Sequence, residues 1–340
     1  MKWLLGALLA LVGLAAIIGA GGYFALKRDD IPYETLAARY ESADSRYMDL
    51  PSGIRMHYRD QGAVQAPGAP PVPTILLIHG YSASLHTWEP WVARLSENYR
   101  VISIDLPGHG LTRAPAGYHA NIENFRDAVG EFVQAAGLTR FAIAGNSMGG
   151  NVAWSYALAH PDQLDALILV DAAGWPHAEE TRANDSLTLK LLRNPMLMPL
   201  LRDIDSTRLF RRGLEASFAN PALATDAMVT RYTELSRAPG HRDILIQLQT
   251  GYAQRTHASN EMLAGIHTPT LILWGRHDNL IPVADAELFH AAIPGSEVKI
   301  FEESGHILQE DDADGSATAA EEFLYRIYEG GALAPAGAEE

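Results

Sequence analysis

The sequence predicts an α/β fold in which a mostly parallel, twisted sheet carries helices on both of its faces. Short, continuously apolar runs of strand length alternate with helix-length segments, and such strands are typical of a sheet that is covered on both sides. Several of these runs end in glycine, serine, aspartate or histidine, the residues that gather at the carboxyl edge of open parallel sheets. A chain of 340 residues is long enough to build this fold as one catalytic domain.

The first part of the predicted core covers residues 45–174. It opens with two extended segments, residues 47–50 and 54–59, which Pro51-Ser52-Gly53 joins into an antiparallel hairpin at one edge of the sheet. The Pro- and Ala-rich stretch 63–73 is then a surface connection. The apolar runs of strand length in the whole core are 74–78, 141–144, 166–170, 270–274 and 298–301. The helix-length segments are 88–98, 122–136, 151–159 and 284–293.

The most informative segment is the hexapeptide 145–150, Gly-Asn-Ser-Met-Gly-Gly, which stands between a strand-like run and a helix-like run. A serine on such a tight turn takes a positive φ, and the residues two positions before and after it must be very small. Gly145 and Gly149 meet that requirement. The turn exposes the Ser147 hydroxyl and directs the N–H of Met148 toward the same point, where it can stabilise negative charge. Ser147 is therefore the predicted nucleophile.

The nucleophile needs two partners, because a serine hydroxyl is weak near neutral pH unless a base lies within hydrogen-bond reach and a carboxylate orients that base. Both residue types follow predicted strands further along the chain. Asp278 ends the turn after the strand 270–274, and His306 ends the loop after the strand 298–301. They are the predicted acid and base. Asp171, at the end of another predicted strand, is the alternative acid.

Three other histidines stand near these motifs. His79 and His109 lie in glycine-containing turns, where a histidine usually supports the loop by hydrogen bonding, and His277 is predicted to face solvent beside the acid. The turns around Gly108 and Gly110 lack the Lys and Ser/Thr register of a phosphate-binding loop.

Taken together, the motifs resemble those of the α/β-hydrolase family over about residues 47–328. The matching segments occur in the family's order and are His79-Gly80, Asp105-Leu106-Pro107-Gly108-His109-Gly110, 145–150, Trp274-Gly275-Arg276-His277-Asp278 and Gly305-His306. The resemblance implies the α/β-hydrolase fold and a catalytic triad of Ser147, His306 and Asp278. It also implies an oxyanion hole formed by the backbone N–H groups of Tyr81 and Met148. No catalytic role is predicted for the Tyr81 phenol.

The interval between Asp171 and Thr270 is too long for a simple connection between strands. Residues 175–264 show helical spacing without strand runs, which resembles the helical cap that many family members place over the active site; residues 265–329 then complete the core. An apolar group within the cap comprises Leu187, Leu189, Leu191, Leu192, Met196, Leu197, Met198, Leu200 and Leu201. Each is predicted to pack the cap onto the sheet, and together they favour a substrate with an apolar acyl or aromatic part.

The amino terminus carries a separate signal, because residues 3–26 form a run of 24 residues without a charged side chain. A helix of that length covers about 36 Å, more than the roughly 30 Å of bilayer hydrocarbon. Residues 1–30 are predicted to be a single membrane anchor, with a cleavable signal segment as the alternative. The catalytic domain is then periplasmic or otherwise extracytoplasmic, or secreted after cleavage. Positive charges flank both ends of the run, so the orientation rests on its likeness to an export-type anchor.

The composition and motifs of the chain argue against several classes of protein. Lys and Arg number 26 against 41 Asp and Glu, a net charge of −15 without a basic stripe, so no nucleic-acid partner is predicted. The sequence lacks zinc-ligand patterns and nucleotide fingerprints, so neither metal nor cofactor is predicted. The absence of cysteine agrees with an oxidising compartment. Residues 330–340 are small and polar and are predicted to be a disordered tail, and the sequence leaves the oligomeric state unknown.

The predicted reaction is hydrolysis of a carboxylic ester, esterase- or lipase-like, through an acyl-enzyme on Ser147. Hydrolases that cleave carbon–carbon bonds of aromatic ring-fission products have a similar turn at the nucleophile, the nucleophile elbow, which is residues 145–150 in this chain. They are an alternative, although they carry a Gly-rich loop where this chain has Tyr81-Ser82-Ala83-Ser84. A non-catalytic binding module on the same fold is a second alternative. Haloalkane dehalogenases and epoxide hydrolases need an aspartate at the elbow, and Ser147 argues against both. A cofactor-free perhydrolase side activity is compatible with the same triad.

Overall fold

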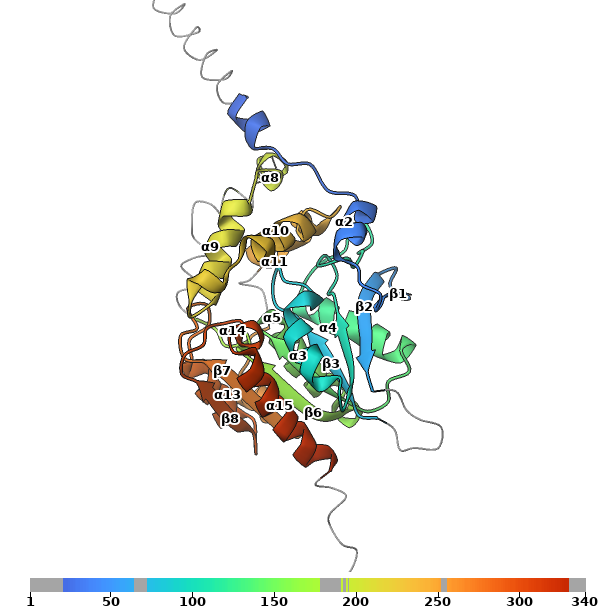
Figure 1. Ribbon diagram of the computed structural model, residues 1–340, viewed down its shortest axis with the longest axis vertical. Helices are drawn as coiled ribbons and strands as arrows, with labels where there is room; N and C mark the ends of the chain where they lie inside the picture. The colour runs from blue at the N-terminus through green and yellow to red at the C-terminus, as the bar shows by residue number, and fades with distance from the viewer. Residues whose placement is uncertain are drawn as a thin grey trace, which may run out of the picture.

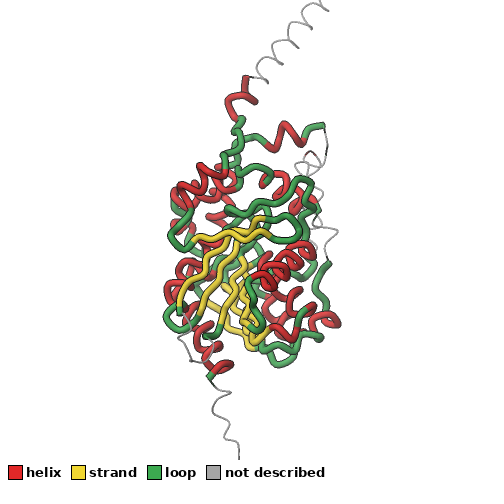
Figure 2. The backbone as a smooth tube through the Cα atoms, turned by 90° about the vertical axis from the view of Figure 1, so that its right-hand side faces the viewer, coloured by secondary structure: helices red, strands yellow, loops and turns green. Residues whose placement is uncertain are grey.

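The computed structural model describes residues 21–63, 72–177, 191, 194, 196–251 and 256–329, which form one eight-stranded sheet with helices on both faces (Figures 1 and 2). The strand order is β1-β2-β4-β3-β5-β6-β7-β8. The pairs β1–β2 and β2–β4 are antiparallel, and every other pair is parallel. The strands are β1 (Ser45–Asp49), β2 (Arg55–Gly62), β3 (Thr74–Ile78), β4 (Arg100–Ile104), β5 (Phe141–Asn146), β6 (Leu164–Val170), β7 (Thr270–Gly275) and β8 (Glu297–Phe301).

The predicted strands and the antiparallel edge hairpin are confirmed, and no strand end is shifted by more than three residues. β3 and β7 are buried along their whole length, as expected of strands covered on both faces. The strand β4 is not among those that the sequence analysis named. Its apolar run is interrupted by Ser103, which is nevertheless buried because β4 pairs with a neighbour on each side.

Alternate residues of each central strand face opposite layers of helices, because side chains along a strand alternate in direction. Ile75 and Leu77 share a buried cluster with side chains of α3 (Glu89–Leu95) and α15 (Ala313–Tyr328). Leu76 and Ile78 share the cluster on the other face with the remaining layer of helices, α4 (Ile122–Ala135), α5 (Met148–Ala159) and α13 (Ala284–Ala292). The four predicted core helices are therefore found, and α15 is one that the sequence analysis did not name.

Helices occupy the described residues between β6 and β7, as predicted for the cap. They are α8 (Met198–Arg202), α9 (Thr207–Ser217), η3 (Pro221–Leu223), α10 (Asp226–Leu235), α11 (His241–Thr250) and α12 (Asn260–Leu263). Several hydrogen bonds join them to the loops at the carboxyl edge of the sheet, and two of these bonds come from predicted site residues. The His306 N–H donates to Ser217 O over 2.7 Å, and the Tyr81 hydroxyl donates to Leu245 O over 3.2 Å.

The apolar group of the cap lies differently from the prediction. Leu187, Leu189 and Leu192 are outside the described residues. Met196 is 83% exposed and Leu200 is 49% exposed, Leu191 and Leu197 are also exposed, and Met198 and Leu201 are half-buried. The prediction that these side chains pack the cap onto the sheet is therefore wrong for the four exposed members. An apolar composition indicates that a segment favours burial, but it does not identify the surface against which the segment is buried.

A segment that we call the N-terminal strap, residues 27–40, fastens the amino-terminal end to the cap; its second half is α2 (Tyr33–Tyr40). The Arg28 N–H donates to Asp203 O over 2.7 Å, and the Arg242 guanidinium binds both Arg28 O and the Asp30 carboxylate. Further contacts join Ile31 to Arg237, Tyr33 to His241, and Arg39 and Tyr40 to Glu234. In Figure 1 the strap passes beside α8, α10 and α11 before it enters β1.

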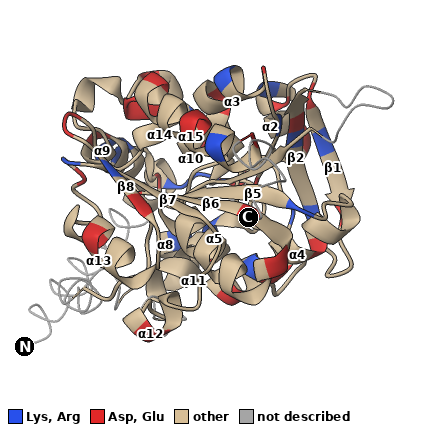
Figure 3. Cartoon of the chain, turned by 90° about the horizontal axis from the view of Figure 1, so that it is seen from below, with Lys and Arg blue, Asp and Glu red and all other residues tan. Residues whose placement is uncertain are grey.

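Most of the predicted anchor, residues 1–20, and the predicted tail, residues 330–340, lie outside the described residues, as does most of the connection 63–73. Residues 21–26 are helical. Within the part of the chain that the structure describes, no helix is both long enough and apolar enough to cross a bilayer. Figure 3 shows acidic and basic residues interspersed over the described elements.

Candidate active site

The turn between β5 and α5 holds Ser147 in a strained conformation, with φ of 54°. Two backbone hydrogen bonds fix it: the Ser147 N–H donates to Val170 O over 3.0 Å, and Ser147 O accepts from the Ala173 N–H over 2.9 Å. A Cβ at Gly145 would lie 2.2 Å from Gly149 O, and a Cβ at Gly149 would lie 2.2 Å from Ile78 O. Only glycine therefore fits at both positions, as the elbow motif predicts.

The elbow glycine gives a stability prediction. Gly149→Ala is expected to lower the free energy of unfolding by about 1–3 kcal/mol or more, because the new methyl group overlaps the backbone of β3. Gly213→Ala is the matched control, since a Cβ at Gly213 in α9 meets nothing within 4 Å. Alanine there is expected to raise stability by about 0.5–1 kcal/mol. Urea unfolding of both variants checks this, and equal shifts in the same direction would contradict it.

The predicted base and acid are in contact. His306 Nδ1 lies 2.7 Å from Asp278 Oδ2, and both side chains are almost fully buried. Asp278 Oδ1 accepts from the N–H groups of Leu280 over 2.7 Å and Ile281 over 2.8 Å, which fixes the carboxylate. Because a carboxylate only accepts, the proton of the shared hydrogen bond lies on Nδ1. Nε2 of His306 is then free to accept a proton from a nucleophile.

Two residues that the sequence analysis missed position the base. We call the loop 302–306, which follows β8 and ends at the predicted base, the base loop. Asn146 Nδ2 donates to His306 O over 3.0 Å, so the residue before the predicted nucleophile holds this loop in place. Asp311 Oδ2, in α14 (Leu308–Asp311), accepts from the Gly305 N–H over 2.6 Å and from the Ala219 N–H over 2.8 Å. Asp311 thereby fastens the base loop to the cap. Asn146 could have been suspected of a role from its place in the hexapeptide 145–150. Nothing in the sequence around Asp311 indicates that it positions the base.

The predicted nucleophile and the predicted base lie at the same edge of the sheet, joined through Asn146. Within the described part of the chain, the Ser147 hydroxyl makes no hydrogen bond, and its side chain is half-buried. In hydrolases without a bound substrate the bond from nucleophile to base is often long and tightens only in the substrate complex.

The predicted oxyanion donors flank Ser147. A Cβ at Gly80 would lie 3.1 Å from Ser147 Cβ, so the loop that leads into Tyr81 passes directly beside the nucleophile. Met148 begins α5, where the first N–H groups of a helix have no acceptor within the helix and form its positive end. The Tyr81 hydroxyl bonds to α11, so the phenol joins this loop to the cap.

The other histidines have the supporting roles predicted for them. His79 is fully buried, with Nδ1 bonded to Gly80 O over 2.8 Å and Nε2 accepting from the Leu106 N–H over 3.0 Å. His109 Nδ1 bonds to Pro107 O over 3.1 Å. Burial lowers the pKa of His79, and it lowers the pKa of His109 well below the ordinary value. His277 is exposed.

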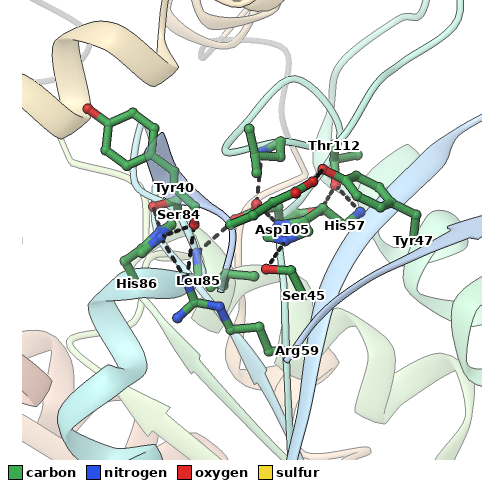
Figure 4. Close-up of polar contacts among 12 residues, drawn as sticks. Tyr40, Ser45, Tyr47, His57, Arg59, Ser84, Leu85, His86, Asp105 and Thr112 are labelled. Carbon is green, nitrogen blue, oxygen red and sulfur yellow. Dashed lines mark hydrogen bonds and ion pairs between the residues drawn. The ribbon is translucent and has the colours of Figure 1, made fainter. Parts of the chain in front are cut away.

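A buried network around Asp105 supports the turns beside the site (Figure 4). Its carboxylate accepts from the N–H groups of Leu85 and Leu111 and from His57 Nδ1, which lies 2.7 Å away. Burial is the largest single influence and opposes ionisation, but the bond from His57 and the electrostatic influence of His57, His79 and His86 together outweigh it and hold the pKa of Asp105 well below its usual range. His57 Nε2 contacts Ser45 Oγ over 2.9 Å. These contacts hold η1 (Leu85–Trp88) and the turn after β4 against β1 and β2.

The alternative acid, Asp171, is placed differently from Asp278. It follows β6 with φ of 45°, its Oδ1 accepts from the Gly275 N–H over 2.8 Å, and its Oδ2 has no partner among the described residues. Burial and the nearby Asp278 raise the pKa of Asp171 well above the ordinary value. His306 Nδ1 contacts Asp278, and this geometry favours Asp278 over Asp171 as the acid partner of His306.

Comparisons with known proteins agree with this architecture. Residues 73–313 match the family described as alpha/beta hydrolase fold. The chain is 27% identical to the monoacylglycerol lipase abhd6-B of Xenopus laevis, over 74% of this chain and 75% of the relative. A bacterial membrane phospholipase A has a similar structure, with a TM-score of 0.69 and 26% identity over 96% of this chain and 99% of that one. A meta-cleavage product hydrolase of Pseudomonas fluorescens IP01 shares the fold, with a TM-score of 0.69 and 23% identity over 83% and 97% of the two chains. The chain is a member of the α/β-hydrolase family.

Proposed function

We propose that this protein is a serine hydrolase that cleaves carboxylic esters with an apolar part. The observation that carries the proposal is the buried hydrogen bond between His306 and Asp278, which faces the same edge of the sheet as the strained Ser147. A base in a fixed tautomer and a half-buried serine hydroxyl at the same edge of the sheet are what acyl transfer requires. The similarity to a monoacylglycerol lipase and to a membrane phospholipase A supports the choice of ester.

In the proposed reaction, Ser147 Oγ attacks the ester carbonyl carbon while His306 Nε2 takes the hydroxyl proton. The N–H groups of Tyr81 and Met148 stabilise the oxyanion of the tetrahedral intermediate. His306 then returns the proton to the departing alcohol, which leaves the acyl group on Ser147. Water, deprotonated by His306, attacks the acyl-enzyme in the same way and releases the carboxylic acid and free Ser147.

A substrate panel tests the proposal. The full chain is assayed with p-nitrophenyl esters of increasing chain length, a monoacylglycerol, a phospholipid and an aromatic ring-fission dienoate. We expect ester hydrolysis with a preference for apolar acyl chains. Turnover of the dienoate alone would favour carbon–carbon hydrolysis instead. No turnover, combined with no labelling of Ser147 by a fluorophosphonate, would indicate a non-catalytic module.

We further propose that residues 1–30 attach the enzyme to a membrane, with the catalytic domain outside the cytoplasm. The uncharged run of residues 3–26 supports this attachment. Carbonate extraction of membranes tests attachment, and protease added to cells whose outer membrane, where there is one, has been opened tests the side. A chain released by carbonate, or protected from protease until the cells are lysed, would contradict one part or the other.

A further inference from the structure

Large apolar side chains are exposed together at the end of the molecule where the amino-terminal segment joins the cap. We call this set the cap apolar face; its members are Phe24, Leu26, Met196, Leu197, Leu200 and Leu209. Phe24 is 72% exposed and Leu209 is 73% exposed. The two parts of the set are joined, because the Asp205 N–H donates to Leu26 O over 2.8 Å and Lys27 pairs with Ile204. Soluble surfaces rarely expose large apolar side chains in such groups unless the group binds something.

The first half of α9 adds positive charge to this face. Leu214 and Ser217 are buried and Phe210 is half-buried, so they mark the inward side of the helix. Arg208, Leu209 and Arg212 lie on the outward half at helical spacing, and all three are exposed. Neither of these arginines forms an ion pair with a described residue, whereas the neighbouring Arg211 pairs with Asp226. In a chain of net charge −15, an exposed leucine between two unpaired arginines favours an anionic partner.

We propose that the cap apolar face rests on an anionic lipid surface. Its apolar side chains would enter the boundary between head groups and acyl chains, and Arg208 and Arg212 would bind lipid phosphates. Two observations select this occupant. The uncharged run of residues 3–26 ends in the sequence at Leu26, which bonds to Asp205 at this face, so the membrane attachment proposed above for residues 1–30, on which this inference rests, also brings a bilayer beside the face. Arg208 and Arg212, which form no ion pair with any described residue, match anionic head groups, whereas a second copy of the chain docked here by symmetry would bring like charges together.

This placement relates the lipid surface to the catalytic residues. The carboxyl end of α9 accepts the His306 N–H through Ser217 O, while its amino-terminal half carries Leu209. A helix of this length spans about 16 Å, so the surface and the base loop lie about one short helix apart. The docking does not depend on the proposed reaction, because it is measured as binding and not as turnover.

The absence of cysteine makes a direct measurement simple. Full-length protein with Gly213→Cys, which keeps Leu209 in place, is labelled with an environment-sensitive fluorophore and reconstituted into vesicles of phosphatidylcholine with or without phosphatidylglycerol. Tyr325→Cys is the matched control, because Tyr325 is a 60% exposed side chain of α15 at the opposite end of the molecule (Figure 1). We expect the probe at position 213 to gain emission and to be quenched by spin-labelled acyl chains, more strongly with phosphatidylglycerol. The probe at position 325 is expected to stay unchanged.

Charge variants separate docking from simple tethering by the amino-terminal run. Arg208→Gln combined with Arg212→Gln is expected to lower the docking equilibrium on anionic vesicles by about thirtyfold, since each arginine near such a surface contributes about a fivefold factor. Little change is expected on neutral vesicles. The proposal is overturned if the probe at position 213 behaves like the one at position 325, or if lipid charge has no effect. It is also overturned if emission at position 213 rises with protein concentration in detergent alone, because a second copy would then cover the face.

Discussion

Ser147→Ala is expected to lower kcat for ester hydrolysis by about a million-fold, because nucleophile and base act as one unit and the loss of either removes most of the catalysis. The fold should persist, since the turn is held by backbone bonds to Val170 and Ala173 that alanine retains. The measurement is the steady-state rate on the best ester of the substrate panel, together with fluorophosphonate labelling of the intact chain.

The matched control is Ser45→Ala. Ser45 also contacts a His–Asp pair, because His57 bonds both to its hydroxyl and to Asp105 (Figure 4). It lies on the edge strand β1, with three strands between β1 and β5, and its β1 position supplies no positive helix end to stabilise an oxyanion. Ser45→Ala should therefore keep most of the activity and the label. If it lost the label while Ser147→Ala kept it, the nucleophile would have been assigned to the wrong serine.

Asp278→Asn is expected to lower kcat by about ten-thousand-fold. An asparagine at this position can donate to His306 Nδ1 and so place the proton of the neutral imidazole on Nε2, where it no longer accepts from the nucleophile. The effect should appear in kcat more than in KM, because the substrate-binding surface is unchanged. Rate measurements with saturating ester check this expectation.

Asp171→Asn is the control for the predicted acid, and it is also expected to change how the free energy of unfolding depends on pH. It should retain activity, since His306 contacts Asp278. Burial raises the pKa of Asp171 above its ordinary value of 3.8, so its contribution to stability is full below that value and is lost as the pH rises toward the folded-state pKa. The asparagine variant lacks this loss, and urea unfolding at several pH values should show the difference. A ten-thousand-fold loss of activity in Asp171→Asn instead would make Asp171 the acid.

The parts of the fold that the sequence predicts best are those governed by local steric or burial rules. The run 74–78 matches β3 because every side chain of that strand is buried, and the glycines around Ser147 are set by backbone overlap. The strand β4 and the helix α15 were not named from the sequence. β4 carries Ser103 within its apolar run, and α15 has a stripe of alanines where larger apolar side chains would have given a clearer helical period.

Contacts between segments far apart in the chain account for the rest. The roles of Asn146 and Asp311 depend on backbone groups of other loops, and no spacing in the sequence encodes those partners. The exposure of Met196 depends on which side of the cap meets the core, and the apolar character of the segment is the same in either case. The identities of Ser147, Asp278 and His306, by contrast, follow from the strand ends at which they stand.

The N-terminal strap has a consequence for biosynthesis. Its residues are the first of the folded part to leave the ribosome, yet their partners lie far along the chain: the Tyr33 hydroxyl bonds to Pro239 O, 206 positions later. Closing so long a loop costs entropy that is recovered only after the partner helices have formed. The contacts of the strap with these helices are therefore expected to form late in translation, so the amino-terminal segment is fastened to the cap only after the helices that it contacts have formed.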